Sequence, residues 1–393
     1  MSGRDRTFAL MFAVMLTIAA GNTGLQSVLP ALGRSLRVAD TAVAAAFSVS
    51  ALLWTLAAPF WANRSDRHGR RAMILTGLGG FTVSLLVCGG FLVAGSTTRE
   101  ERTRALTLLA SAFGLGTILG PALAPWLVLG AVGDVDVGLA GPAFAFAVVG
   151  VVMWLVVRRG LPDDRPGVSA PADGDVRGAQ SAYPSIGGAP TGATVAAATE
   201  PRAEQVGFFD PRVRGWMAAG LVMGHAQAMT GQTIGFLVID RLRLAPADAL
   251  GPTGLVLMVG AGAALLAQWG VIPRLDLSPK RLVVVGLVLA AAGTAATGLA
   301  GDLYGIACAY ALASLGFGFT RPGFTAGASL AVGPAGQGSV AGKVTSINGA
   351  SFILGPSIGV ALYEGWQPLP YLLAGTACVA MIAYAGWRLG DAR

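Results

Sequence analysis

The fold of this chain is decided by stretches such as Leu282-Val-Val-Val-Gly-Leu-Val-Leu-Ala-Ala-Ala-Gly-Thr-Ala-Ala-Thr-Gly-Leu-Ala300, in which no side chain is charged. A helix needs about 20 apolar residues to cross the hydrocarbon core of a bilayer. Ten similar segments occur at roughly 8–29, 41–62, 72–94, 105–130, 138–157, 215–239, 249–272, 302–331, 338–362 and 368–387. They lack the apolar–polar alternation of barrel strands. The sequence therefore predicts an all-α membrane protein with eleven transmembrane helices.

The composition agrees with a chain whose surface is mostly covered by lipid. Of the 393 residues, 54% are hydrophobic and only 12% are charged, whereas a soluble domain carries about 25% charged residues. This excludes an ordinary soluble enzyme and a disordered protein. The net charge of +7 does not indicate a nucleic-acid partner, because the basic residues are distributed between the apolar segments and do not form one continuous basic surface.

One long polar stretch, residues 158–213, divides the apolar segments into two groups. It is rich in Pro, Gly, Ala, Ser and Asp, and such a segment cannot bury enough apolar surface to order itself. We therefore expect three parts. They are an N-terminal transmembrane bundle of five helices over residues 1–157, a flexible cytoplasmic linker over 158–213, and a C-terminal transmembrane bundle of six helices over 214–393.

The two groups of segments repeat each other. Several residues of the first half return 210 positions later, unchanged or replaced by a similar residue. They are Gly21-Asn22-Thr23, which returns as Gly231-Gln232-Thr233, and Arg64, Asp66 and Arg71, which return as Arg274, Asp276 and Arg281. Farther along, Gly120-Pro121 returns as Gly355-Pro356, but at an offset of 235. The additional 25 residues are about the length of one membrane helix. The sequence therefore predicts a twelve-helix plan that lacks the fourth helix.

The basic residues predict the orientation of the chain. If each segment keeps the side that it has in a complete twelve-helix plan, all but four of the 27 Lys and Arg residues face the cytoplasm. The four exceptions are Arg34, Arg37, Arg241 and Arg243. Strict alternation through eleven helices would instead leave 19 basic residues outside, against the positive-inside rule. We expect a multi-pass protein of the cell inner (plasma) membrane, with both termini intended for the cytoplasm.

A basic loop between the second and third segments reads Pro59-Phe-Trp-Ala-Asn-Arg-Ser-Asp-Arg-His-Gly-Arg-Arg71. Gly69 allows a backbone with positive φ. Asp66 suits the N-terminus of the helix that follows, where the helix dipole favours an anion. The arginines hold the loop on the cytoplasmic side, and anchoring alone is the simplest interpretation.

The loop also resembles the signature Gly-x-Leu-x-Asp-Arg-x-Gly-Arg-Arg/Lys of the major facilitator superfamily of secondary transporters. The matching residues are Asp66, Arg67, Gly69, Arg70 and Arg71. Ala62 and Arg64 replace the first Gly and the Leu. The resemblance implies the two-bundle fold of this family, a monomer, and a cytoplasmic latch of ion pairs that is closed in the outward-facing state.

A second motif, Gly116-Thr-Ile-Leu-Gly-Pro-Ala-Leu-Ala-Pro125, lies in the fourth apolar segment. Glycines four residues apart let another helix approach closely, and proline bends a helix because it removes a backbone hydrogen bond. Gly116, Gly120 and Pro121 resemble the antiporter signature of the family's fifth helix, although Ala124-Pro125 replaces its Gly-Gly. The resemblance favours the drug/proton antiporter branch.

Polar side chains within the apolar segments are candidates for a substrate cavity. Repeat-related helices of such transporters line a cavity near mid-membrane, and polar groups in lipid usually face such a cavity. The candidates are Asn22, Gln26, His225, Gln232 and Asn348. For Asn22, Gln26 and Gln232, hydrogen bonding between helices is an equal alternative.

Three basic side chains in the second half need separate interpretation. The imidazole of His225 is suited to proton exchange near neutral pH, or it lies near the membrane interface. Arg321 and Lys343 fall near the cytoplasmic ends of their segments. Anchoring is the favoured role for both.

No catalytic constellation is present in the sequence. Two histidines and three scattered cysteines do not form a zinc site of ordinary spacing, and no Gly-rich phosphate loop occurs. We therefore expect no enzyme, no metal and no cofactor. The first hypothesis is a secondary transporter that exports small amphipathic compounds in exchange for protons. The alternatives are a truncated, non-transporting family member that acts as a membrane scaffold, and a metabolite symporter.

Overall fold

The computed structural model of the chain describes residues 141–160, 204–275, 277–333 and 336–389, two short strands, scattered positions between 9 and 52, and the single residues Leu75 and Leu123. The segments predicted between 53 and 130 lie outside the described residues apart from these two leucines. The count of eleven helices and the missing fourth helix therefore stay predictions.

The described part of the second half is helical throughout its predicted spans, and each span differs from the predicted one by at most three residues at either end. The helices are α8 (Arg214–Leu242), α9 (Leu250–Leu265) with its continuation through the π-helical segment η5 (Leu266–Val271) and α10 (Ile272–Leu275), α11 (Pro279–Leu299), α12 (Leu303–Leu330), α13 (Gln337–Gly365) and α14 (Leu369–Arg388). Five spans between Leu250 and Arg388 are long and apolar enough to cross a membrane. The helical membrane architecture predicted for the second half is thereby confirmed for its described residues.

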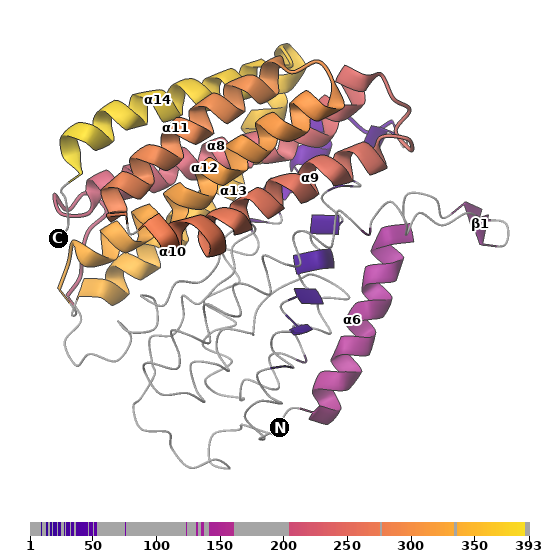
Figure 1. Cartoon of the computed structure of the whole chain (residues 1–393). Helices are drawn as coiled ribbons and strands as arrows, with labels where there is room; N and C mark the ends of the chain where they lie inside the picture. The colour runs from indigo at the N-terminus through magenta and orange to yellow at the C-terminus, as the bar shows by residue number, and fades with distance from the viewer. Residues whose placement is uncertain are drawn as a thin grey trace.

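Small residues explain how α11 and α12 pack side by side (Figure 1). A Cβ added to Gly316 would lie 2.3 Å from the backbone N of Ala290, and one added to Gly293 would lie 2.2 Å from the backbone N of Ala313. The two backbones therefore touch. Close approach through small residues is how membrane helices gain packing energy, since lipid supplies no hydrophobic force between them.

Helices α8 and α13 also pack closely at glycines. A Cβ on Gly355 would lie 2.6 Å from Cβ of Ala228, and one on Gly359 would lie 2.8 Å from Cα of Met229. Pro356 lies inside α13 between these two glycines. The Gly-Pro motif of the second half thus places α13 directly against α8.

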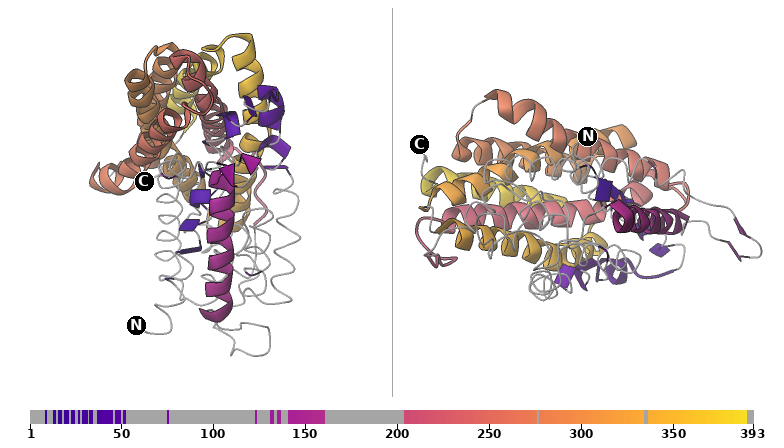
Figure 2. Two further views of the ribbon diagram at one scale, coloured as in Figure 1. Left: turned by 90° about the vertical axis from the view of Figure 1, so that its right-hand side faces the viewer. Right: turned by 90° about the horizontal axis from the view of Figure 1, so that it is seen from below.

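Helix α6 (Gly141–Gly160) belongs to the first half and is steeply inclined to the helices of the C-terminal bundle (Figure 1; Figure 2). Most of its valines are exposed, with Val148 at 63% and Val152 at 53%, as expected for a surface against lipid, whereas Val157 is buried. The Trp154 Nε1–H donates to the Leu75 carbonyl over 2.9 Å. Before α6, strands β1 (Ala131–Val132) and β2 (Val135–Asp136) form an antiparallel hairpin that the sequence analysis did not predict.

The last residues of the stretch predicted as linker are held against the C-terminal bundle. Val206 is buried, and its N–H donates to the Ser339 hydroxyl over 3.1 Å. Arg212 pairs with Glu204 and with Asp210. The side-chain and backbone hydrogen bonds that Arg212 donates to Asp210 lower the pKa of this partly exposed carboxyl to about 2. Because α6 also continues to Gly160, the prediction of a flexible linker now concerns residues 161–203, which lie outside the described residues.

Candidate functional site

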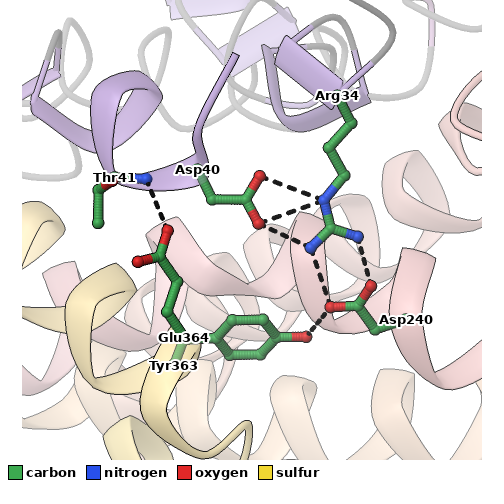
Figure 3. A network of polar contacts seen from close by, with 6 residues as sticks. All are labelled: Arg34, Asp40, Thr41, Asp240, Tyr363 and Glu364. Atoms are coloured by element: carbon green, nitrogen blue, oxygen red, sulfur yellow. Dashed lines mark hydrogen bonds and ion pairs between the residues drawn. The ribbon is translucent and has the colours of Figure 1, made fainter. Parts of the chain in front are cut away.

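An ion-pair network joins the two halves at one end of the helices (Figure 3). The guanidinium of Arg34, from the first half, bonds both carboxylate oxygens of Asp240 at the end of α8; the longer contact, from Nη2, is 3.0 Å. The same guanidinium pairs with Asp40, with Nη2 2.7 Å and Nε 3.2 Å from the carboxylate. Arg34 thus holds two carboxylates in a forked geometry that only arginine provides.

Residues at the end of α13 complete this network. The Tyr363 hydroxyl donates to Asp240 Oδ2 over 2.7 Å. The Glu364 carboxylate accepts the backbone N–H of Thr41 over 3.1 Å, which satisfies a free donor at the start of the helical residues after Ala39. We call Arg34, Asp40, Thr41, Asp240, Tyr363 and Glu364 the end network.

Apolar and small residues around the end network also join the halves. The Ser48 and Ser357 hydroxyls are 2.7 Å apart, 309 residues distant in sequence. A Cβ on Gly235 would lie 2.7 Å from Cγ of Pro30. Val43 packs in one buried cluster with side chains of the second half. The two halves are therefore in direct contact at this end.

The position of Arg34 and Asp240 follows from how two helices end. Arg37 and Arg243 both have left-handed backbones, with φ of 57° and 52°. The residue after each donates its N–H five residues back, from Val38 to Gly33 over 2.8 Å and from Leu244 to Ile239 over 3.1 Å. Both helix ends are thus Schellman motifs. Arg34 and Asp240 each lie three residues before the left-handed residue.

These helix ends correct the repeat in the first helix of each half. They correspond at an offset of 206, one helical turn less than the 210 that the sequence matches gave. The difference comes from the loops that follow. The loop between Arg243 and the start of α9 is four residues longer than the loop between Arg37 and Asp40. At the corrected offset, Gln26 corresponds to Gln232.

The electrostatics of the end network favour the charged forms. Burial alone would lower the pKa of Arg34, but the hydrogen bonds to Asp240 and Asp40 outweigh it and raise the pKa above its ordinary value. Asp240 lies in the last turn of α8, where the helix dipole disfavours an anion. Arg34 and Tyr363 compensate for that placement. Arg34, Asp40 and Asp240 keep 14–23% of their side-chain surface exposed.

A second polar centre lies inside the C-terminal bundle, around Arg321 of α12. This side chain is buried, with 8% of its surface exposed. Its Nη2–H donates to Oε1 of Gln227 on α8, and its Nη1–H donates to Oδ1 of Asn348 on α13 over 3.4 Å. Both partners are neutral amides and half-buried. Among the described residues, no carboxylate is recorded in an ion pair with Arg321.

The anchoring role predicted for Arg321 is wrong. A helical side chain leans toward the N-terminus of its own helix, and Arg321 lies nine residues before the end of α12. Its guanidinium is therefore directed into the bundle and away from the nearer helix end. Gln227 lies 13 residues after the start of α8, or about 20 Å along the helix at ~1.5 Å per residue. An arginine at such depth costs about 2.5–3.5 kcal/mol on insertion scales.

Three of the predicted cavity residues are described. Asn348 contacts Arg321. Gln232 is 4% exposed, and its Nε2 has no hydrogen-bond partner among the described residues. His225 is half-buried, and its Nδ1 lies 2.9 Å from the Leu221 carbonyl. The structure therefore brings Asn348, but neither of the others, into the Arg321 centre.

The remaining predicted site residues lie outside the described residues. They are Asn22, Gln26, Asp66, Arg67, Gly69, Arg70, Arg71, Gly116, Gly120 and Pro121. Their assignments to the cavity, the loop motif and the antiporter-type motif stay predictions. In the part of the chain that the structure describes, no group of three His, Cys, Asp or Glu residues is placed to hold a metal ion.

Comparisons with known proteins agree with this architecture. The Major Facilitator Superfamily profile matches residues 85–356. The chain belongs to the major facilitator superfamily. No curated protein matches the sequence. Membership makes the chain a multi-pass membrane transporter protein and places small molecules as the substrates of its family.

Solved major facilitator structures share the fold at low identity. The human organic anion transporter MFSD10 (TETRAN) is 16% identical, with a TM-score of 0.65 over 98% of this chain and 100% of that one. A peptide-bound POT family transporter is 14% identical, with a TM-score of 0.64 over 96% and 95% of the two chains. A bacterial homolog of human Spinster, inward-facing and unoccupied, is 11% identical, with a TM-score of 0.64 over 99% and 96%.

Proposed function

We propose that the chain exports small amphipathic compounds by alternating access, in exchange for protons. The observation that supports this most is the end network, in which Arg34 of the first half binds Asp240 of the second. Such a contact can break and re-form as the halves rock about a central site, as family membership leads us to expect.

The end network is the outer gate in this proposal. The four basic residues expected to face outward include Arg34 and Arg241, and both lie at the joined end. The C-terminal end of α14 lies at the opposite end of the bundle, since α14 begins four residues after α13 ends. With cytoplasmic termini, the end at which the two halves are in contact is then the outer end. The loop motif Asp66–Arg71 is the latch that closes the cytoplasmic side in the other state.

His225 is the proposed proton carrier. A carbonyl only accepts hydrogen bonds, so the contact with Leu221 O assigns the proton of the neutral ring to Nδ1. Nε2 is then the nitrogen that takes up a second proton. The imidazole is half-buried in α8, so part of its surface remains accessible for proton transfer in this proposal.

A flux measurement tests the proposal. Purified full-length protein in proteoliposomes is loaded with a fluorescent amphipathic dye, and dye movement is followed with and without a pH gradient. We expect the gradient to accelerate transport, the ionophore that collapses it to remove the acceleration, and His225→Ala to lose the pH dependence. Unchanged flux after collapse of the gradient would contradict proton exchange.

A non-transporting scaffold is the second candidate, and the 25-residue deficit in the first half favours it. It predicts no flux in the same vesicles for any dye. Insertion of a fourth helix between residues 94 and 105 would then restore flux, whereas a competent transporter gains nothing from it.

A further inference from the structure

We infer that Arg321, between Gln227 and Asn348, binds the oxyanion group of an amphipathic organic anion, and that such anions are the substrate class of this transporter. The inference deepens the proposed function. That the bound anion is a transported substrate rests on that function. The binding itself is tested separately below.

The geometry of the centre leaves donor capacity for a ligand. A guanidinium has five N–H donors in one plane and matches two oxygens of a carboxylate, sulfonate or phosphate. Here two neutral amide oxygens accept from Nη1 and Nη2, and the Asn348 contact is long, at 3.4 Å. The amides orient the guanidinium but do not neutralise its charge.

The helices that surround Arg321 in the described part of the chain supply no carboxylate to it. In the sequence, the predicted spans of the first half contain no Asp or Glu. In α8, α12 and α13 the acidic residues are Asp240 and Glu364 alone. Asp240 lies 13 residues from Gln227, about 20 Å along α8 at ~1.5 Å per residue, and it already binds Arg34. None of these helices therefore supplies a counter-ion to Arg321, and the proposal gives that role to a bound anion.

The partners of Arg321 lie on helices that also reach the contact with the first half. The half-buried amides belong to α8 and α13, and both helices also contact the first half, through Asp240 and Ser357. Deeper along the bundle, the Tyr310 hydroxyl lies 3.5 Å from where a Cβ of Gly231 would be. An aromatic side chain of α12 thus lies against the same face of α8 as Gln227, where it can contact the apolar part of the ligand.

A purely structural role for Arg321 makes a different prediction. If Arg321 only cross-links α8, α12 and α13, its removal lowers the thermal stability. If it is an uncompensated charge that awaits an anion, its removal or neutralisation raises the stability of the ligand-free protein and abolishes the response to anions.

The experiment measures thermal unfolding of the full-length protein in an uncharged detergent. The probes are benzenesulfonate, which stays charged, and benzenesulfonamide, its neutral counterpart. The variants are Arg321→Met and Gln227→Glu; the second places a carboxylate against the guanidinium without removing it. The matched controls are Arg388→Met at the exposed end of α14 and Gln268→Glu in η5.

We expect benzenesulfonate, but not benzenesulfonamide, to raise the melting temperature of the wild type and both controls in a saturable way. Gln227→Glu melts higher than the wild type without ligand and needs at least tenfold more benzenesulfonate for half of the shift. Arg321→Met shows no shift. An equal shift in Arg321→Met and wild type overturns the inference, and so does a lower melting temperature for Gln227→Glu.

Phosphatidylglycerol in mixed micelles, compared with phosphatidylcholine, distinguishes a lipid headgroup from a soluble anion. A shift that depends on Arg321 with this lipid and is absent with benzenesulfonate overturns the assignment to a transported anion. Because these measurements involve no flux, failure of anion binding is distinguishable from failure of proton-coupled export.

Discussion

Arg34 and Arg321, two of the buried or half-buried arginines in the described part of the chain, have opposite surroundings. Arg34 lies at the contact of the halves and binds two carboxylates, Asp40 and Asp240. Arg321 lies inside the C-terminal bundle and binds only the amide oxygens of Gln227 and Asn348. Arg34, the more exposed of the two, forms ion pairs with two carboxylates, whereas no described residue forms an ion pair with the more deeply buried Arg321.

This difference separates two roles for the same side chain. A pair formed within the chain stabilises one arrangement of the halves and is lost when they separate. A buried cation without a counter-ion stabilises nothing until an anion arrives. The comparison therefore predicts opposite responses to substitution at the two positions, and the predictions below are ordered from the largest expected effect to the smallest.

A cross-link beside the end network gives the largest effect. In the Ser48→Cys, Ser357→Cys variant, made without the three native cysteines, the thiols occupy positions whose hydroxyls are 2.7 Å apart, so a disulfide can form after a small adjustment. We expect oxidation to abolish transport and a reductant to restore it, measured as dye flux. The single-cysteine variants are controls; full flux in the cross-linked protein would show that the contact need not open.

Removal of one charge from the end network gives an intermediate effect. Asp240→Asn leaves Arg34 with Asp40 alone and weakens the contact between the halves. We expect about a tenfold larger open fraction, equivalent to ~1.4 kcal/mol. The rate at which an impermeant maleimide labels Ser357→Cys measures this fraction. Asp248→Asn, in the loop after α8, is the matched control, and an unchanged labelling rate would mean that Asp240 does not hold the halves together.

Matched removal of the two arginines sharpens the comparison directly. Arg34→Met leaves two carboxylates close together, so we expect its melting temperature to fall. Arg321→Met removes an uncompensated charge, so we expect its melting temperature to rise. Each shift is a few degrees, since ~1 kcal/mol moves the midpoint of a domain of this size by about 2–4 °C. Shifts of the same sign would remove the distinction drawn here.

Loss of the Tyr363 hydroxyl gives the smallest effect. Tyr363→Phe removes one donor to Asp240 while the Arg34 pair remains. At a net ~0.7 kcal/mol for one hydrogen bond, we expect about a threefold increase in the maleimide labelling rate. Tyr304→Phe, on an exposed side chain of α12, should leave the rate unchanged.

The sequence predicts the helices of the second half because each is an apolar run between polar loops, and every described end lies within three residues of the prediction. It does not predict the end network, because Arg34 and Asp240 are 206 residues apart and no local pattern links them. Both residues were visible only as charges at the ends of spans.

The sequence analysis missed the centre around Arg321 because it did not consider the direction of the Arg321 side chain. Position within the span placed Arg321 near a helix end, but side chains lean toward the helix N-terminus, so the guanidinium points into the bundle. Gln227 carried a usable signal, since it is a polar residue in the middle of an apolar segment. The repeat offset failed in the first helix because three matching residues cannot fix a helical register, whereas the Schellman ends do.

The matching Schellman ends have a consequence for the origin of the chain. Arg34 and Asp240 occupy the same position in the two halves, yet they carry opposite charges. A protein formed by duplication of one half would at first have identical residues there, and two arginines or two aspartates would repel each other. Closure of this end through an ion pair therefore requires that the copies diverged, and a perfectly symmetric ancestor had to close by other means.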